Sequence, residues 1–155
     1  MATVYLETSF VSACVTNRTD TKSLYRLQIS REWWQTQASK HALFISAEVV
    51  AELSSPTYPM RSEALNWIED VELLAITDEV LGFADILVAE HVMPSPSSGD
   101  AMHVAVSTIH RIEYVLSWNV KHLANVNKQR HLQTICVRAG LLPPRIITPE
   151  LLWES

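Results

Sequence analysis

The segment Thr3-Val-Tyr-Leu-Glu-Thr-Ser9 indicates the fold class, because a β-rich run ends on an acid and passes straight into a helix signal. The apolar run Thr3 to Leu6 predicts a buried strand, and Glu7 follows it directly. Thr8 and Ser9 then offer an N-cap to the apolar segment after them. The order at the start of the chain is therefore strand, acid, helix.

The same strand-then-helix order repeats along the chain. Ala42-Leu-Phe-Ile45 predicts a second strand, and Ser46 is a good N-cap for a helix from Ala47 to Leu53. Repeated βα units with nearly unbroken apolar strands predict a parallel sheet with helices on both faces. We therefore expect an α/β fold, a three-layer α/β/α sandwich around a central parallel sheet of four to five strands. The other expected elements are helices over 21–40, 60–71, 78–92, 100–111 and 128–139, strands over 73–76 and 114–117, and an edge strand at 146–147.

Composition favours one compact domain over residues 1–155. Hydrophobic residues make up 48% of the chain, which argues against disorder. No apolar run reaches the roughly 18 residues that span a bilayer, and the N-terminus lacks a signal-peptide pattern, so we expect a cytoplasmic protein without a membrane segment. Cys14 and Cys136 lie far apart in apolar contexts and are expected to be buried thiols.

The net charge of −5 argues against a protein that coats nucleic acid, because such binding depends on neutralising phosphates. The charge is uneven, however. Residues 46–102 hold eleven acids and one base, whereas residues 103–145 hold six Lys or Arg and one acid. An acidic centre beside a basic flank suits a metal ion and an anionic polymer, although solvated helix faces explain the same pattern.

Four polar side chains are predicted to meet at the carboxyl ends of the strands, where ligands gather in open parallel sheets. Glu7 ends the first strand and Asn119 follows the fourth, while Glu52 and Asp100 lie on helices that open at the same edge. Carboxylate and amide oxygens are ligands that Mg²⁺ and Mn²⁺ prefer, and a divalent cation removes the repulsion among clustered acids. We therefore predict a metal site at Glu7, Asp100, Asn119 and Glu52.

Each position also has a purely structural explanation. Asp100 favours a helix N-terminus through the helix dipole, and Asn119 can satisfy turn backbone. Glu52 lies one turn after Glu48, and either can be a solvated charge. His103, one turn after Asp100, is expected to be a structural histidine. Candidate contacts for a substrate phosphate are Thr8, Ser9, Lys121 and His122.

Four separated motifs resemble those of PIN domains, and specifically the small VapC-like toxins of toxin–antitoxin pairs. Tyr5-Leu-Glu-Thr-Ser9 is similar to the first-strand motif in a subgroup that carries Glu where most members have Asp. The segment 46–54, ending Ala-Glu52-Leu-Ser, resembles the one that supplies the family's glutamate. Asp100-Ala-Met-His103-Val-Ala and Leu116-Ser-Trp-Asn119 resemble the third and fourth motifs, and the similarity extends to Pro149.

This resemblance implies a Mg²⁺- or Mn²⁺-dependent endoribonuclease, frequent homodimers and inhibition by a cognate antitoxin, with transfer or ribosomal RNA as the expected substrate. Glu7, Glu52, Asp100 and Asn119 would be its catalytic residues. Asn119 stands where the family more often has an aspartate, which removes one negative charge and should weaken metal affinity. The chief alternative is a catalytically weak or inactive PIN domain that binds RNA or protein. A receiver-like module would need adjacent acids after the first strand, and a haloacid-type phosphatase would need Asp-x-Asp there; Glu7-Thr8-Ser9 provides neither.

Two neighbouring tryptophans, Trp33 and Trp34, lie on the predicted helix 21–40. Their density suggests the hypothesis that they form a homodimer or antitoxin surface. A structural role in the core would account for them equally.

Overall fold

A five-stranded sheet in which every pairing is parallel forms the centre of the computed structural model, which describes residues 1–155. The strand order is β3-β2-β1-β4-β5, so the first strand of the chain is the central one. The predicted α/β class, with a parallel sheet of four to five strands, is confirmed. The strands are β1 (Thr3–Leu6), β2 (Ala42–Ser46), β3 (Glu72–Leu74), β4 (Tyr114–Leu116) and β5 (Arg145–Ile147).

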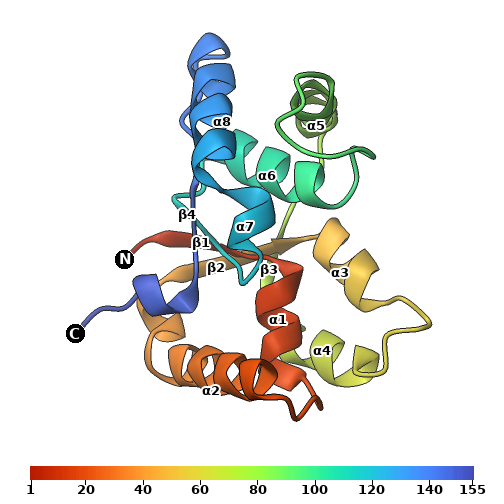
Figure 1. Ribbon diagram of the computed structural model, residues 1–155, viewed down its shortest axis with the longest axis vertical. Coiled ribbons are helices and arrows are strands. Elements are labelled where there is room, and N and C mark those ends of the chain that lie inside the picture. Colours follow the sequence, from red (N-terminus) through yellow and green to blue (C-terminus); the bar gives the residue numbers. More distant parts are fainter.

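Helices cover both faces of the sheet, as the apolar strands require. Figure 1 shows α1, α2 and α4 on one face and α5, α6 and α8 on the other. None of the helices is long and apolar enough to cross a membrane. The helices are α1 (Thr8–Val15), α2 (Thr21–Thr36), α3 (Ala47–Leu53), α4 (Arg61–Trp67), α5 (Asp78–Ala89), α6 (Asp100–Ile109), α7 (Val120–Leu123) and α8 (Val126–Arg138), with short 3-10 turns at Ala38–Lys40 and Pro149–Leu151.

Several predicted boundaries were wrong by a few residues. The predicted helix 78–92 ends at Ala89 because His91 adopts a φ of 59°, which a right-handed helix cannot continue. The helix predicted to reach residue 111 ends at Ile109 for the same reason at Arg111, whose φ is 58°. Helix α8 begins at Val126, earlier than predicted, because the side chain of Asn125 accepts a hydrogen bond from the Lys128 amide and caps it.

Trp33 belongs to the core, which corrects the hypothesis that it forms an interaction surface. Its side chain is 0% exposed, and its indole N–H donates to the carbonyl of Leu152, 2.6 Å away. The ring also meets Phe10 edge-on at 5.5 Å between centroids. Trp33 thereby ties α2 to the C-terminal segment. Trp34 is half-buried and packs against Trp67.

Replacing Trp33 should therefore cost much of the folding free energy. Trp33→Ala removes a fully buried ring and leaves the Leu152 carbonyl without its donor, so we expect the free energy of unfolding to fall by about 3–5 kcal/mol. Trp153→Ala is the matched control, since that ring is 44% exposed, and should cost less than about 1 kcal/mol. Urea unfolding followed by circular dichroism measures both. Equal losses in the two variants would contradict the placement of Trp33 in the core.

Candidate active site

Glu7 lies directly after the central strand and is held by hydroxyl groups from two elements. Its backbone N–H continues the β1–β4 pairing by donating to the Leu116 carbonyl at 3.1 Å. Its Oε1 atom accepts a hydrogen bond from Ser117 Oγ, 2.6 Å away, and another from Ser9 Oγ. The side chain is only 5% exposed. Both bonds end on Oε1, so Oε2 has no hydrogen-bond partner within the protein.

The start of α1 differs from the prediction in a way that serves the site. Thr8 and Ser9 were expected to cap the helix, but Glu7 occupies the cap position with extended backbone and α1 begins at Thr8. Neither hydroxyl is used for capping. Thr8 donates to Glu52 Oε1 at 2.5 Å, and Ser9 donates to Glu7. The first turn of α1 therefore orients the two glutamates.

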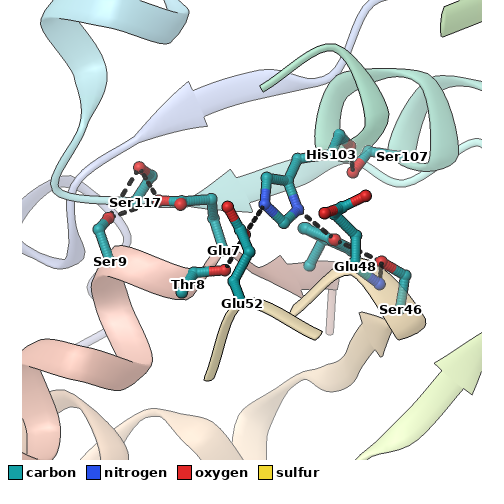
Figure 2. Close-up of polar contacts among 10 residues, drawn as sticks. Glu7, Thr8, Ser9, Ser46, Glu48, Glu52, His103, Ser107 and Ser117 are labelled. Carbon is teal, nitrogen blue, oxygen red and sulfur yellow. Dashed lines mark hydrogen bonds and ion pairs between the residues drawn. The ribbon is translucent and has the colours of Figure 1, made fainter. Parts of the chain in front are cut away.

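Glu52 pairs with a buried histidine. On α6, His103 is 1% exposed, and its Nε2 atom lies 2.5 Å from Glu52 Oε1 on α3. Its other ring nitrogen, Nδ1, lies 2.6 Å from the hydroxyl of Tyr5 on β1, which lies 2.8 Å from Ser46 Oγ. Figure 2 shows this series of hydrogen bonds beside the cluster of Glu7, Ser9 and Ser117. A continuous line of polar groups thus joins four elements, β2, β1, α6 and α3, under the site.

The pKa shifts indicate that Glu52 and His103 form an ion pair. Burial lowers the pKa of His103, but the hydrogen bond to Glu52 and the charges of nearby glutamates outweigh it, so the pKa lies above its ordinary value. Burial raises the pKa of Glu52, but the hydrogen bond and charge of His103 outweigh it and lower the pKa. Burial chiefly raises the pKa of Tyr5 well above its usual value, so this hydroxyl stays protonated.

Asp100 and Asn119 lie at the same edge of the sheet but are not part of these hydrogen-bond groups through their side chains. Asp100 is half-buried in the first turn of α6, one turn before His103 and on the same helix face. The backbone N–H of Asn119, at the start of α7, donates to Ser117 Oγ, which in turn donates to Glu7. Sequence reasoning did not select Ser117, because a serine after a strand has no distinctive pattern.

The acids at this edge fit a hard divalent cation by their chemistry. The molecule's two salt bridges join Glu52 to His103 and Arg138 to Glu90, so no Lys or Arg neutralises Glu7, Glu52 or Asp100. No three His, Cys, Asp or Glu side chains converge closely enough to enclose a metal ion. Mg²⁺ commonly binds through one or two carboxylates and keeps several waters, so oxygen ligands that stop short of a closed cage suit it.

The side chains of the other two predicted substrate contacts make no hydrogen bond to the groups of the site. Lys121 and His122 on α7 are exposed to solvent.

Both cysteines are buried, as predicted, and burial raises the pKa of Cys14 and brings that of Cys136 to about 11. A thiolate nucleophile is therefore not available at this edge.

Comparison with solved structures identifies the fold. VapC20 of Mycobacterium tuberculosis, described as a Sarcin-Ricin loop cleaving toxin, matches with a TM-score of 0.59 and 20% identity, over 78% of this chain and 93% of that one. VapBC-1 of nontypeable Haemophilus influenzae matches with a TM-score of 0.58 and 14% identity, over 96% and 98%. The chain has the VapC fold.

A third match agrees with this result. VapBC2 of Rickettsia felis, bound to a DNA fragment from their promoter, has a TM-score of 0.54 and 12% identity over 98% of this chain and 99% of that one. No protein-family model and no curated protein matches the sequence. The VapC fold is therefore established by shape across nearly the whole chain, and it agrees with the PIN-like architecture that the four motifs imply.

The ion pair can be tested by titrating His103. NMR of the imidazole resonances should give a pKa above about 6.5 in the wild type and a lower one in Glu52→Gln, where burial acts without the carboxylate. Glu48→Gln is the control, because Glu48 lies one turn earlier on α3 and makes no hydrogen bond to His103; it should shift the pKa only slightly.

The raised pKa of His103 also sets the direction in which folding stability changes with pH. The folded chain binds the His103 proton more tightly than the unfolded chain, so the stabilisation is complete below pH about 6.5 and is lost as pH rises through the folded-state pKa. An unchanged His103 pKa in Glu52→Gln would show that the two groups are not paired.

Proposed function

We propose that the chain is a metal-dependent endoribonuclease that hydrolyses RNA phosphodiester bonds and acts as the toxin of a toxin–antitoxin pair. One observation carries this proposal: the Glu7 carboxylate is 5% exposed at the end of the central strand, is fixed by two hydroxyls, and forms no salt bridge. A buried carboxylate with no Lys or Arg beside it is costly to hold in its charged form, and a bound divalent cation would lower that cost. The VapC fold, shared with a toxin described as Sarcin-Ricin loop cleaving, supports the same function.

The proposed metal is Mg²⁺ or Mn²⁺, with Glu7, Asp100 and Asn119 as ligands and Glu52 supporting water or a second ion. When bound, the cation would polarise the scissile phosphate, acidify water and stabilise the leaving oxygen. The protein's own contribution is orientation. Ser9 and Ser117 fix Glu7, while Thr8 and His103 fix Glu52.

The protonation of the network sets what Glu52 can do. With His103 protonated, its Nε2–H donates to Glu52 Oε1, so that oxygen is occupied by Thr8 and His103 together. The second carboxylate oxygen has no protein partner, and the side chain is 36% exposed. Glu52 can therefore accept a hydrogen bond from water on that side, which suits a group that orients the attacking water.

The proposed partners are RNA, with transfer or ribosomal RNA as the candidate class, a cognate antitoxin and a second copy of this chain. The RNA and antitoxin proposals rest on the VapC-like motifs and on the fold shared with the VapBC structures. The homodimer rests on the motifs alone.

Cleavage of RNA should require both the metal and Asp100. Purified protein incubated with total RNA should cut in Mg²⁺ or Mn²⁺ and not in EDTA. Asp100→Asn keeps the size and loses the charge, so we expect cleavage to fall at least about 100-fold through lost stabilisation of the metal and transition state.

Asp78→Asn is the matched control for that experiment. Asp78 is the first residue of α5, as Asp100 is of α6, so both substitutions remove the same helix-dipole interaction. The control should cut at the wild-type rate. Binding of RNA without any cutting by the wild type would reject the nuclease and favour the non-catalytic PIN domain.

A further inference from the structure

Arg26 on α2 stacks on the Trp118 ring next to the candidate site. The guanidinium of Arg26 sits 5.2 Å from the centroid of the Trp118 ring, which follows β4 in the same loop as Ser117. The Trp118 indole N–H donates to the buried Ser30 hydroxyl at 2.8 Å, and Tyr25 packs edge-on against the ring at 6.4 Å. The ring is thereby fixed, and stacking on it restricts where Arg26 can place its charge.

Arg26 has no acidic partner. Neither of the two salt bridges in the molecule involves it or Arg18. Both arginines line one groove of about 590 Å³, together with the hydroxyl groups of Ser9, Ser12 and Tyr58, and no Asp or Glu lines it. In a chain of net charge −5, a groove with two unpaired arginines and no acid indicates a site for an anion.

The groove adjoins the proposed catalytic acid through a shared neighbour, Ser9. Ser9 lines the groove and donates to Glu7, and the Trp118 backbone N–H donates to the same Ser9 hydroxyl at 2.9 Å. A ligand lying along Ser9 and Ser12 would thus pass from the Glu7 carboxylate to the two arginines. A single small anion would fill little of this space, whereas a polyanion would occupy the groove and the site together.

We infer that this groove binds the RNA strand beside the bond to be cut, with Arg26 pairing a backbone phosphate one or more nucleotides from Glu7. This inference rests on the proposed nuclease function, since it names where the substrate of that site lies. The basic residues that would contact RNA are then not those that the sequence suggested. The expected basic flank, residues 103–145, contributes nothing to the groove, whose lining residues all fall between Ser9 and Met60.

Binding measured without cleavage tests the inference separately from catalysis. The probe is a fluorescein-labelled single-stranded RNA of roughly 12 nucleotides, titrated in EDTA at several salt concentrations by fluorescence anisotropy. Arg26→Ala should weaken binding roughly tenfold and reduce the slope of log affinity against log salt by about 0.7, the value for one phosphate contact on a single strand.

Two further variants make the result specific. Arg26→Lys keeps the charge, so it should keep the wild-type salt slope while losing part of the affinity. Arg130→Ala removes the same charge from an exposed position on α8, on the opposite face of the sheet from α2 (Figure 1), and should leave affinity and slope unchanged. In cleavage assays, Arg26→Ala should raise KM with little change in kcat.

The outcomes separate the two proposals. If Arg26→Ala keeps the wild-type affinity and salt slope, the groove inference is overturned, even if the protein cuts RNA normally. Binding of an acidic peptide but of no RNA would also overturn it. Binding that depends on Arg26, in a protein that never cuts RNA, upholds the groove and rejects the nuclease.

Discussion

The parallel pairing of β1 with β2 on one side and β4 on the other determines where the residues of the site emerge from the sheet. Leu6 of β1 lies opposite Leu116 of β4, so the residues that follow these strands, Glu7 and Ser117, emerge together. Ser46 ends β2 at the same edge. In a parallel sheet the carboxyl ends of all strands lie at the same edge, and the candidate site is formed by the residues that follow them.

That arrangement also creates a physical problem that the side chains solve. The Tyr5 hydroxyl and the His103 ring lie in surroundings that exclude water, where an unpaired polar group is costly. The chain from Ser46 through Tyr5 and His103 to Glu52 satisfies these groups one by one. Because each group is hydrogen-bonded to the next, the buried His103 sets the orientation of Glu52 from inside the core.

Much of this architecture could be predicted from sequence, and the failures have identifiable causes. The helix α3 was predicted at its observed bounds because Ser46 is a strong cap and residues 54–56 stop the helix. The four residues of α7 are too few to show a helical period. The strand predicted at 73–76 is found at Glu72–Leu74, where it pairs only with β2 at the edge of the sheet. The sequence left a core role and a surface role open for Trp33, because a tryptophan pair on a helix does not reveal which ring faces the core.

The site was predicted in outline but not in its connections. Acids at strand ends follow from the order of elements, so Glu7 and Glu52 could be placed together in advance. The partnership of Glu52 with His103, 51 residues away, and of Glu7 with Ser117, 110 residues away, depends on the register of strands and the packing of α3 on α6. Local patterns contain no information about such distant pairs. The Arg26–Trp118 stack was missed for the same reason.

Mn²⁺ can show directly whether the carboxylates at the strand ends bind a divalent cation. Crystals soaked in Mn²⁺ should give an anomalous peak within coordination distance of the Glu7 and Asp100 carboxylates, and the peak should be absent in Glu7→Gln crystals soaked in the same way. A wild-type crystal in which Mn²⁺ binds elsewhere, while Glu7 keeps only Ser9 and Ser117 as partners, would contradict a metal site at these carboxylates.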